Sequence, residues 1–352
     1  MIKSVNNSLR GKNIYVGLSG GVDSAVTAAL LQEAGAHVTG VFIKGWYPPG
    51  MPCTWANDRR DAMRVAAHLR IPFVTLDASK EYKESVIDYL LDEYKAGRTP
   101  NGDIMCNRDV KFGVFYRYAK ECGADLIATG HYAQIQHGRL LRGIDASKDQ
   151  SYFLWAVPRE ILADVIFPLG EMEKTDTRML AKKYKLPNAI KRDSQGICFL
   201  GNVSVEDFLR KEIGTTVGKA LDEEGKMIGS HGGAVLYTLG ERIALEGATP
   251  GPWYVLAKDM KNNTLTVSRE KNKRAHVPET LRLTSCNWLS PNLLEGNSVI
   301  AQYRYHGPNV PGILSTDTNT WIPNEVSEDI PAPGQSLVLY VNDECIGGGI
   351  IE

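Results

Sequence analysis

The chain has 352 residues, more than one ordinary hydrophobic core accommodates, which predicts two or three domains. Its content of 43% hydrophobic and 23% charged residues is typical of globular proteins, and no apolar run approaches the roughly 18 residues that span a bilayer. With 40 basic and 41 acidic residues, the net charge is −1. This balance argues against a protein that coats nucleic acid non-specifically, but it allows a local basic surface.

The N-terminal segment MIKSVNNSLRGKN is polar and leads directly into a strand-like run. Because no apolar signal segment precedes that run, we expect a cytoplasmic protein without a membrane anchor. The six cysteines, at positions 53, 106, 122, 198, 286 and 345, contain no CxxC pair. Neither a zinc ribbon nor a thioredoxin-like motif is therefore indicated, and in a reducing compartment these residues are thiols.

The first 200 residues alternate between strand-like and helix-like segments. Apolar runs typical of strands lie at 14–18, 38–46, 71–78 and 124–134. Helical patterns lie between and after them, at 25–35, 58–70, 79–97 and 110–123. This alternation predicts an α/β fold with a doubly wound parallel sheet, and sheets of that kind bind ligands beyond the carboxyl ends of their strands.

After about residue 200 the helical periodicity fades and short β-like runs appear, namely GAVLYTL (233–239), WYVLAKD (253–259) and NTLTVSR (263–269). From about 276 the pattern is almost wholly strands and turns, as in LRLTSCNWL, SVIAQYRYH, QSLVLYVND and CIGGGIIE. Such a pattern predicts a small β-barrel or sandwich. We therefore expect three domains, spanning residues 1–203, 204–275 and 276–352.

The segment GLSGGVDS, residues 17–24, follows a predicted strand and opens a predicted helix. Backbone amides and the positive helix end can hold an anion there. The segment matches neither the Walker A loop nor GxGxxG, but it resembles the SGG[VI]DS signature of the PP-loop ATP pyrophosphatases. An ordinary glycine turn is the alternative. The residues expected to hold ATP are Gly17, Leu18, Ser19, Gly20, Gly21, Val22, Asp23 and Ser24, and the Asp23 carboxylate suits a magnesium ion beside the phosphates.

Two cysteines lie among turn-forming and charged residues, Cys106 in RTPNGDIMCNRDVKFG and Cys198 in RDSQGICFLG. The thiolate is the nucleophile, and a nearby cation or helix N-terminus lowers the pKa of a thiol. Lys191 and Arg192 precede Cys198, whereas Arg108 and Lys111 follow Cys106, which we place just before a helix. Because free cysteine is among the most buried residue types, a structural role for each thiol remains an alternative.

Several longer motifs follow one another in the order found in the bacterial tRNA-specific 2-thiouridylase family, which the chain resembles over nearly its whole length. They are GLSGGVDS, KAGRTPNGDIMCN, ATGHY, LLRGIDASKDQSYFL, KRDSQGICFLG, TPGPWYVLAKD and PGQSLVLY with GGGIIE. The resemblance implies a PP-loop domain, a small central domain and a C-terminal β-barrel that contacts tRNA.

The resemblance also implies a reaction. In that family ATP adenylates O2 of the wobble uridine U34 in tRNAs for lysine, glutamate and glutamine, and a persulfide then delivers sulfur to C2. AMP and pyrophosphate are released and 2-thiouridine is formed. By motif, Cys198 matches the persulfide carrier and Cys106 the nucleophile that resolves it through a transient Cys106–Cys198 disulfide. The sulfur donor would be a relay carrier protein or a cysteine desulfurase.

Further site residues are implied by position in the same motifs. Ile43 would lie near the adenine and Gly130 beneath the nucleotide. The target base would meet Asn101, Gly102 and Asp103, with Asp103 as candidate acid/base, and tRNA would contact Lys148, Asp149, Gln150, Tyr303 and Arg304. Gly102 stands where the family usually has proline, which predicts a base-facing loop that is more mobile before tRNA binds.

Other readings remain open. His131 is expected to be a hydrogen-bonded structural histidine. Cys53 is either a third thiol near the site or a structural cysteine, as we expect for Cys122, Cys286 and Cys345. The basic run SREKNKRAH (268–276) is either a solvated linker or an RNA contact. An amidotransferase or ligase-like enzyme that adenylates small metabolites would need the glycine turn but not both thiols. A non-enzymatic RNA-binding module that uses nucleotide as a switch is the third hypothesis.

Overall fold

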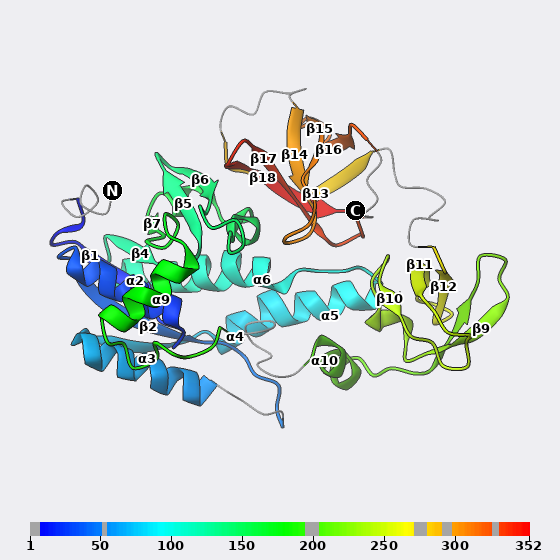
Figure 1. The fold of residues 1–352 in the computed structure, drawn as a ribbon, viewed down its shortest axis with the longest axis horizontal. Helices are drawn as coiled ribbons and strands as arrows, with labels where there is room; N and C mark the ends of the chain where they lie inside the picture. Colours follow the sequence, from blue (N-terminus) through cyan, green and yellow to red (C-terminus); the bar gives the residue numbers. More distant parts are fainter. Residues whose placement is uncertain (1–7, 51–54, 194–203, 271–279, 291–297, 326–330) are drawn as a thin grey trace.

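The structure is a computed structural model, and it describes residues 8–50, 55–193, 204–270, 280–290, 298–325 and 331–352. Cys53, Cys198 and most of the basic run 268–276 lie outside the described residues. Figure 1 shows an α/β region at the N-terminal side, a small β region in yellow-green, and a barrel in orange and red. Within the described ranges, no helix is both long and apolar enough to cross a membrane.

The first region is built on a five-stranded sheet in the order β3-β2-β1-β4-β7. All four neighbouring pairs are parallel, as predicted. The strands are β1 (Asn13–Gly17), β2 (His37–Lys44), β3 (Phe73–Asp77), β4 (Leu126–Ala128) and β7 (Val165–Ile166). With β1 at the centre, the turn that follows it opens at the carboxyl edge of the sheet, where such folds bind ligands.

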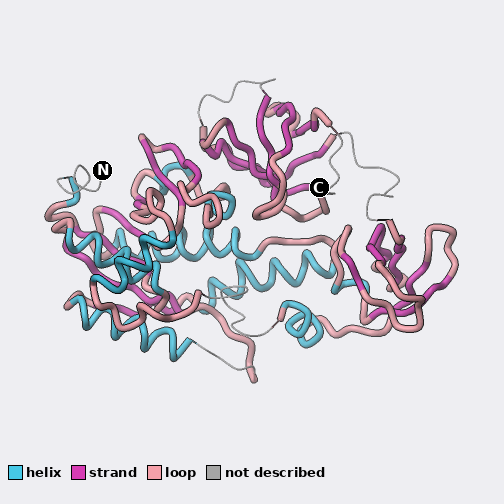
Figure 2. Tube along the Cα trace, in the orientation of Figure 1, coloured by secondary structure: helices cyan, strands magenta, loops and turns pink. Residues whose placement is uncertain are grey.

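Helices cover both faces of this sheet (Figure 2). On one face, apolar side chains of the sheet pack against α2 (Val22–Glu33), α3 (Trp55–Leu69) and α9 (Lys174–Lys183). The other face packs against α4 (Ser79–Tyr82), η1 (Lys83–Ile87), α5 (Asp88–Lys95), α6 (Gly102–Met105), η2 (Cys106–Val114) and α7 (Phe115–Glu121). Successive residues of a strand point to opposite faces. The two clusters therefore confirm the doubly wound arrangement.

The prediction of one strand over 124–134 was wrong. The chain leaves the sheet after β4, and β5 (Ala133–Gln136) pairs with β6 (Arg139–Arg142) in a hairpin that joins the sheet of the C-terminal barrel. Gly130 lies in the break, against the backbone of the first turn of α2. The sequence pattern does not reveal this break, because hydrophobic periodicity does not show which sheet a short strand joins.

The prediction that Cys106 precedes a helix was also wrong. The helical segment begins at Gly102, and Cys106 is the first residue of its π-helical part, η2. The Asn101 side chain accepts hydrogen bonds from the amides of Asp103 (3.1 Å) and Ile104 (3.3 Å) and so caps the helix. The Asn-Gly pair, which is typical of turns, conceals this earlier start.

The central region contains α10 (Val205–Glu212) and a second five-stranded sheet in the order β10-β11-β12-β8-β9. Its strands are β8 (Gly218–Leu221), β9 (Met227–His231), β10 (Arg242–Ile243), β11 (Trp253–Asp259) and β12 (Thr264–Ser268). The strands predicted at 253–259 and 263–269 are confirmed. GAVLYTL is not a strand, because it forms the 3₁₀ turn η4 (Ala234–Leu236), which starts after Gly233 at φ +128°.

The C-terminal strands form a barrel, which resolves the barrel-or-sandwich alternative. They run in the order β13-β16-β15-β14-β17-β18, and a β13–β18 pairing closes the cylinder. The strands are β13 (Leu281–Trp288), β14 (Ser298–Gln302), β15 (Val310–Ser315), β16 (Thr320–Pro323), β17 (Ser336–Val341) and β18 (Glu344–Ile351). Strand β18 also pairs with β6 through Glu344 and Leu141, which ties the barrel to the first region.

Candidate active site

The glycine turn after β1 is shaped by hydroxyl contacts. Ser24 Oγ accepts from the amide of Ser19 (3.2 Å) and donates to the carbonyl of Gly21 (3.2 Å). Gly20 has φ +81°, and a Cβ there would lie 2.3 Å from the carbonyl oxygen of Asp58. The first amides of α2 have no partner within the helix. The turn therefore presents donors and a positive helix end to an anion.

Gly130 lies where β4 ends, directly beside the start of α2. A Cβ at this position would lie 2.8 Å from the amide nitrogen of Ser24 and 2.9 Å from the carbonyl carbon of Asp23. Only glycine allows this close approach of two backbone segments. Gly130 thus sets the distance between the end of β4 and the glycine turn at residues 17–24 (the phosphate turn).

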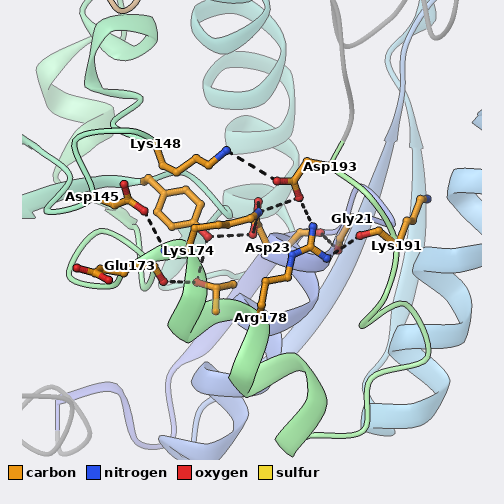
Figure 3. Close-up of polar contacts among 12 residues, drawn as sticks. Gly21, Asp23, Asp145, Lys148, Glu173, Lys174, Arg178, Lys191 and Asp193 are labelled. Atoms are coloured by element: carbon orange, nitrogen blue, oxygen red, sulfur yellow. Dashed lines mark hydrogen bonds and ion pairs between the residues drawn. The ribbon is translucent and has the colours of Figure 1, made fainter.

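A charged cluster surrounds the first turn of α2 (Figure 3). Lys174 Nζ, at the start of α9, lies 2.7 and 2.8 Å from the two carboxylate oxygens of Asp23 and 2.9 Å from Asp193. Arg178, one turn further along α9, also pairs with Asp193. Burial raises the pKa of Asp193, but pairing with the surrounding cations outweighs burial and lowers it. Lys174 therefore links the phosphate turn to Asp193.

The segment 188–193 contacts the phosphate turn at a second place. Asn188 Nδ2 donates to the carbonyls of Gly20 and Gly21, both at 3.0 Å. Lys191 Nζ lies 2.9 Å from Asp58 and 2.8 Å from Asp61, both on α3. Burial lowers the pKa of Lys191, but the two carboxylates raise it, so its ammonium stays charged. Lys191 is thus held by α3, whereas Cys198, whose pKa we expected it to lower, lies outside the described residues.

Sequence reasoning missed Lys174, Arg178 and Asn188. None belongs to the motifs read above, and nothing in the local pattern separates Lys174 from the other lysines. Lys174 reaches Asp23 across 151 positions of the chain. Only a fold that brings α9 against α2 could identify it.

Cys106 lies in an apolar setting. It is 5% exposed and belongs to the core cluster between the sheet and helices α5 to α7. The neighbouring Asn107 donates to the carbonyl of Phe153 at 3.0 Å, which fixes this turn against the segment after Gln150. Arg108 forms a two-point ion pair with Asp109, with both contacts at 2.8 Å. The arginine charge expected to activate Cys106 is therefore shared with a carboxylate.

Asn101, Gly102 and Asp103 form the start of the helix that carries Cys106. Asn101 is the cap, Gly102 is buried as the first helical residue, and Asp103 is half-buried in the first turn. A Cβ on Gly102 would lie 2.9 Å from Leu90 Cδ1, the end of a flexible side chain. The first helical position is also the one that best accepts proline. The segment expected to be a loop is therefore a capped helix start.

A Gly102→Pro variant is expected to gain up to about 1 kcal/mol in unfolding free energy, because proline restricts the unfolded chain and suits this position. The amides of residues 103–106 should exchange more slowly in the absence of tRNA, as hydrogen exchange would measure. Gly102→Ala is the matched control, since it adds the Cβ beside Leu90 without the ring. Equal exchange in the wild type and the proline variant would contradict the expected mobility.

The residues expected to contact tRNA lie in two places. Lys148 is 41% exposed in its side chain and lies 3.9 Å from Asp193, whereas Asp149 is buried. Gln150 accepts from the amide of Tyr132 at 3.0 Å. In the barrel, Tyr303, which we expected to contact tRNA, is 1% exposed and belongs to the barrel core.

Arg304 follows Tyr303 in the turn after β14, and the next residue, Tyr305, is 38% exposed. The ring of Tyr305 lies 4.5 Å from that of Phe153, centroid to centroid. This segment therefore presents Tyr305, rather than Tyr303, to the solvent beside the chain that follows Gln150.

Two further expectations concern apolar surroundings. Ile43 lies near the end of β2, partly buried against the same cluster as Cys106. His131 is buried and lies 2.6 Å from Thr129 Oγ1, and burial together with Lys111 lowers its pKa well below the usual value. A neutral, hydrogen-bonded ring agrees with the expected structural role.

Within the described ranges, no group of three or more histidine, cysteine or acidic residues is placed to hold a metal ion.

The parallel sheet, the glycine turn at the carboxyl end of its central strand and the charged cluster at the adjoining helix define a nucleotide-binding α/β protein. Three family models match the chain, one after another. They are described as the tRNA methyl transferase HUP domain (residues 12–202), the tRNA methyl transferase PRC-barrel domain (206–269) and the Aminomethyltransferase beta-barrel domain (278–351).

Two curated relatives match the chain over nearly its whole length. The chain is 41% identical to the tRNA-specific 2-thiouridylase MnmA of Chromobacterium violaceum, over 97% of this chain and 92% of that protein. It is 37% identical to the tRNA-specific 2-thiouridylase MnmA of Bacillus velezensis, over 96% and 94%. The chain belongs to the tRNA-specific 2-thiouridylase family, as its motifs predict, and is an enzyme of that family.

Solved structures with a similar arrangement include a 4-thiouridine synthetase in complex with RNA and bound ATP. It is 24% identical with a TM-score of 0.39, and the match covers 54% of this chain and 45% of that chain. The U34-tRNA thiolase NcsA from Methanococcus maripaludis is 18% identical with a TM-score of 0.35, over 53% and 63%.

Proposed function

We propose that this chain is a tRNA-uridine 2-sulfurtransferase that uses ATP to convert U34 of tRNAs for lysine, glutamate and glutamine to 2-thiouridine. The observation that carries the proposal is the phosphate turn at the carboxyl edge of the sheet, in a chain that matches 2-thiouridylases over nearly its full length. The turn supplies amides and a helix N-terminus for the phosphates of ATP. The helix after Asn101 supplies a thiol.

The first step activates the uridine. A carbonyl oxygen is a poor leaving group, whereas an adenylated oxygen leaves as AMP. The uridine O2 attacks the α-phosphate of ATP, and pyrophosphate departs toward the residues of the turn, Gly17 to Ser24. Ile43 and Gly130 complete the nucleotide site, and Asp103 is the candidate to move the proton, once the base comes within hydrogen-bond reach.

Magnesium ion fits this site through one carboxylate, that of Asp23, because Mg²⁺ usually keeps several waters and is held mainly by substrate phosphates. The ion would neutralise charge on the departing pyrophosphate. Lys174 Nζ also contacts both carboxylate oxygens of Asp23, at 2.7 and 2.8 Å. The chain's own contribution is to hold Asp23 at the helix start, where Tyr132 Oη donates to it at 3.0 Å.

The second step transfers sulfur. The terminal sulfur of a Cys198 persulfide attacks C2 and AMP leaves, so the base becomes joined to Cys198 through a disulfide. The Cys106 thiolate then attacks the inner sulfur, which forms the Cys106–Cys198 disulfide and releases the terminal sulfur on the base. A reductant regenerates both thiols, and a persulfide donor, either a relay carrier protein or a cysteine desulfurase, reloads Cys198. We place this chemistry in the cytoplasm, where such disulfides are transient.

The direct test combines purified protein, unmodified tRNA for lysine, glutamate or glutamine, ATP, magnesium ion and a persulfide donor of proven activity. We expect 2-thiouridine at position 34, detected by mass spectrometry of nucleosides, with one AMP formed for each base thiolated. Omission of ATP is the control. Absence of thiolated base with an active donor would refute the proposal, and AMP formation with a small metabolite instead of tRNA would favour a ligase.

A further inference from the structure

Asp149 lies in the segment expected to contact tRNA, yet its carboxylate is enclosed by protein donors. The residue is 7% exposed. One oxygen accepts from the amides of Gly143 (2.9 Å) and Ser151 (3.1 Å), and the other accepts from Ser151 Oγ (3.0 Å) and Arg142 Nη1 (3.2 Å). An anion is also repelled by RNA phosphates. Asp149 is therefore unsuited to direct contact with the tRNA backbone.

Arg142, the cationic partner of Asp149, reaches into the barrel. Its guanidinium lies 3.6 Å from the ring centroid of Tyr340 on β17, within the range of a cation–π contact. Its Nη2 donates to Asn309 at 3.1 Å, and its backbone amide donates to the carbonyl of Asp343 at 2.9 Å. Arg142 ends β6, so one residue joins the first region to three parts of the barrel.

The chain after Asp149 makes further contacts with the barrel. Ser151 Oγ lies 3.1 Å from Tyr340 Oη, and Tyr152 Oη donates to the carbonyl of Ser336 at 3.0 Å. Asn287 Nδ2 of β13 donates to the carbonyls of Trp155 (2.7 Å) and Val157 (3.0 Å). These contacts form a junction between the first region and the barrel, and Asp149 is joined to it through Arg142 and Ser151.

The same segment is linked to the phosphate turn through Tyr132. The backbone amide of Gln150 donates to the carbonyl of Tyr132 at 2.8 Å, and Gln150 Oε1 accepts from the amide of Tyr132 at 3.0 Å. Tyr132 Oη in turn donates to Asp23 at 3.0 Å. A chain of fixed contacts thus leads from the barrel through residues 149–151 to the start of α2.

We propose that Asp149 and Arg142 are positioning residues, which hold the barrel at a fixed place beside the nucleotide site and support tRNA binding without touching tRNA. Lys148, whose ammonium is partly exposed, is the residue of this segment that faces RNA phosphates. The inference rests on the proposed function, because it takes tRNA as the substrate.

The salt dependence of tRNA binding distinguishes a residue that contacts RNA phosphates from a residue that only positions the barrel. Each phosphate contact adds about 0.7–0.9 to the slope of log affinity against log salt concentration. Lys148→Ala should therefore lower that slope by about this amount. Asp149→Asn, which keeps the shape and one acceptor oxygen but loses the charge, should weaken tRNA binding by about 2- to 30-fold with the slope unchanged. Its affinity for ATP in the absence of tRNA should remain that of the wild type.

Two further measurements test the junction itself. The combined effect of Arg142→Met and Asp149→Asn on tRNA binding should be smaller than the sum of the two single effects, because both substitutions break the same Arg142–Asp149 ion pair. Hydrogen exchange of β17 amides in the free protein should be faster in each variant. Tyr340→Phe, which removes only the hydroxyl contact with Ser151, provides a milder variant in case Asp149→Asn does not fold, and it should also speed exchange without a change in slope.

A fall of the slope in Asp149→Asn equal to that in Lys148→Ala would overturn the inference, and so would fully additive effects of the two substitutions. Failure of the wild-type protein to bind tRNA at all would instead refute the proposed function. The two failures are therefore distinguishable in one set of titrations.

Discussion

A Cys106→Ser variant is expected to adenylate tRNA but to stop after sulfur attack, with the base joined to Cys198 through a disulfide. Serine keeps the size of the buried side chain but cannot attack the inner sulfur of that bond. Release of 2-thiouridine without added thiol should fall on the order of a thousandfold or more, as for removal of other catalytic nucleophiles. The covalent tRNA adduct should appear on a denaturing gel and disappear with dithiothreitol.

Cys345→Ser is the matched control for the loss of a buried thiol. Cys345 is fully buried in β18, and burial raises its pKa to about 12, so it is protonated at neutral pH and is no nucleophile. This variant should keep full thiolation and form no adduct. Cys198→Ser should block thiolation without an adduct, because no persulfide can form. Undiminished thiolation in Cys106→Ser would show that another group resolves the persulfide.

A Gly130→Ala variant is expected to lose ATP use almost completely. The added methyl group would lie 2.8 Å from the backbone nitrogen of Ser24 and 2.9 Å from the carbonyl carbon of Asp23, and neither atom can turn aside as a side chain can. The first turn of α2 must therefore shift relative to β4. A displacement of about 1 Å at a positioning element costs roughly a hundredfold in rate. The measurement is AMP formation with tRNA, together with ATP affinity by titration.

Gly123→Ala provides the comparison for general destabilisation. Gly123 has φ +83° and no atom within 4 Å of the added methyl group, and it lies after α7 at the opposite end of β4. The strained backbone should cost about 1–2 kcal/mol of unfolding free energy. ATP use should nevertheless remain near the wild-type level. If both variants lost AMP formation in proportion to their loss of stability, a local role for Gly130 would be excluded.

The sequence by itself determined the features that depend on neighbours along the chain. Alternation of apolar runs and helical patterns predicted the parallel sheet, and it identified the turn at 17–24, because strand, glycines and helix follow one another there. The barrel strands were found in the same way, from closely spaced apolar runs and turns. Short-range periodicity carries this information, since each residue's face follows from its position in one element.

Only the tertiary structure decided which side chains meet. Lys174 reaches Asp23 across 151 positions, and Arg142 reaches Asn309 across 167. No local pattern encodes such pairs, because the folding of the whole chain selects them. Asp149 is an example. Its motif match suggested an RNA contact, but its carboxylate is buried and accepts from four protein donors. The carboxylate is therefore part of the junction with the barrel. Cys106 likewise proved helical, because the Asn101 cap outweighs the turn preference of the Asn-Gly pair.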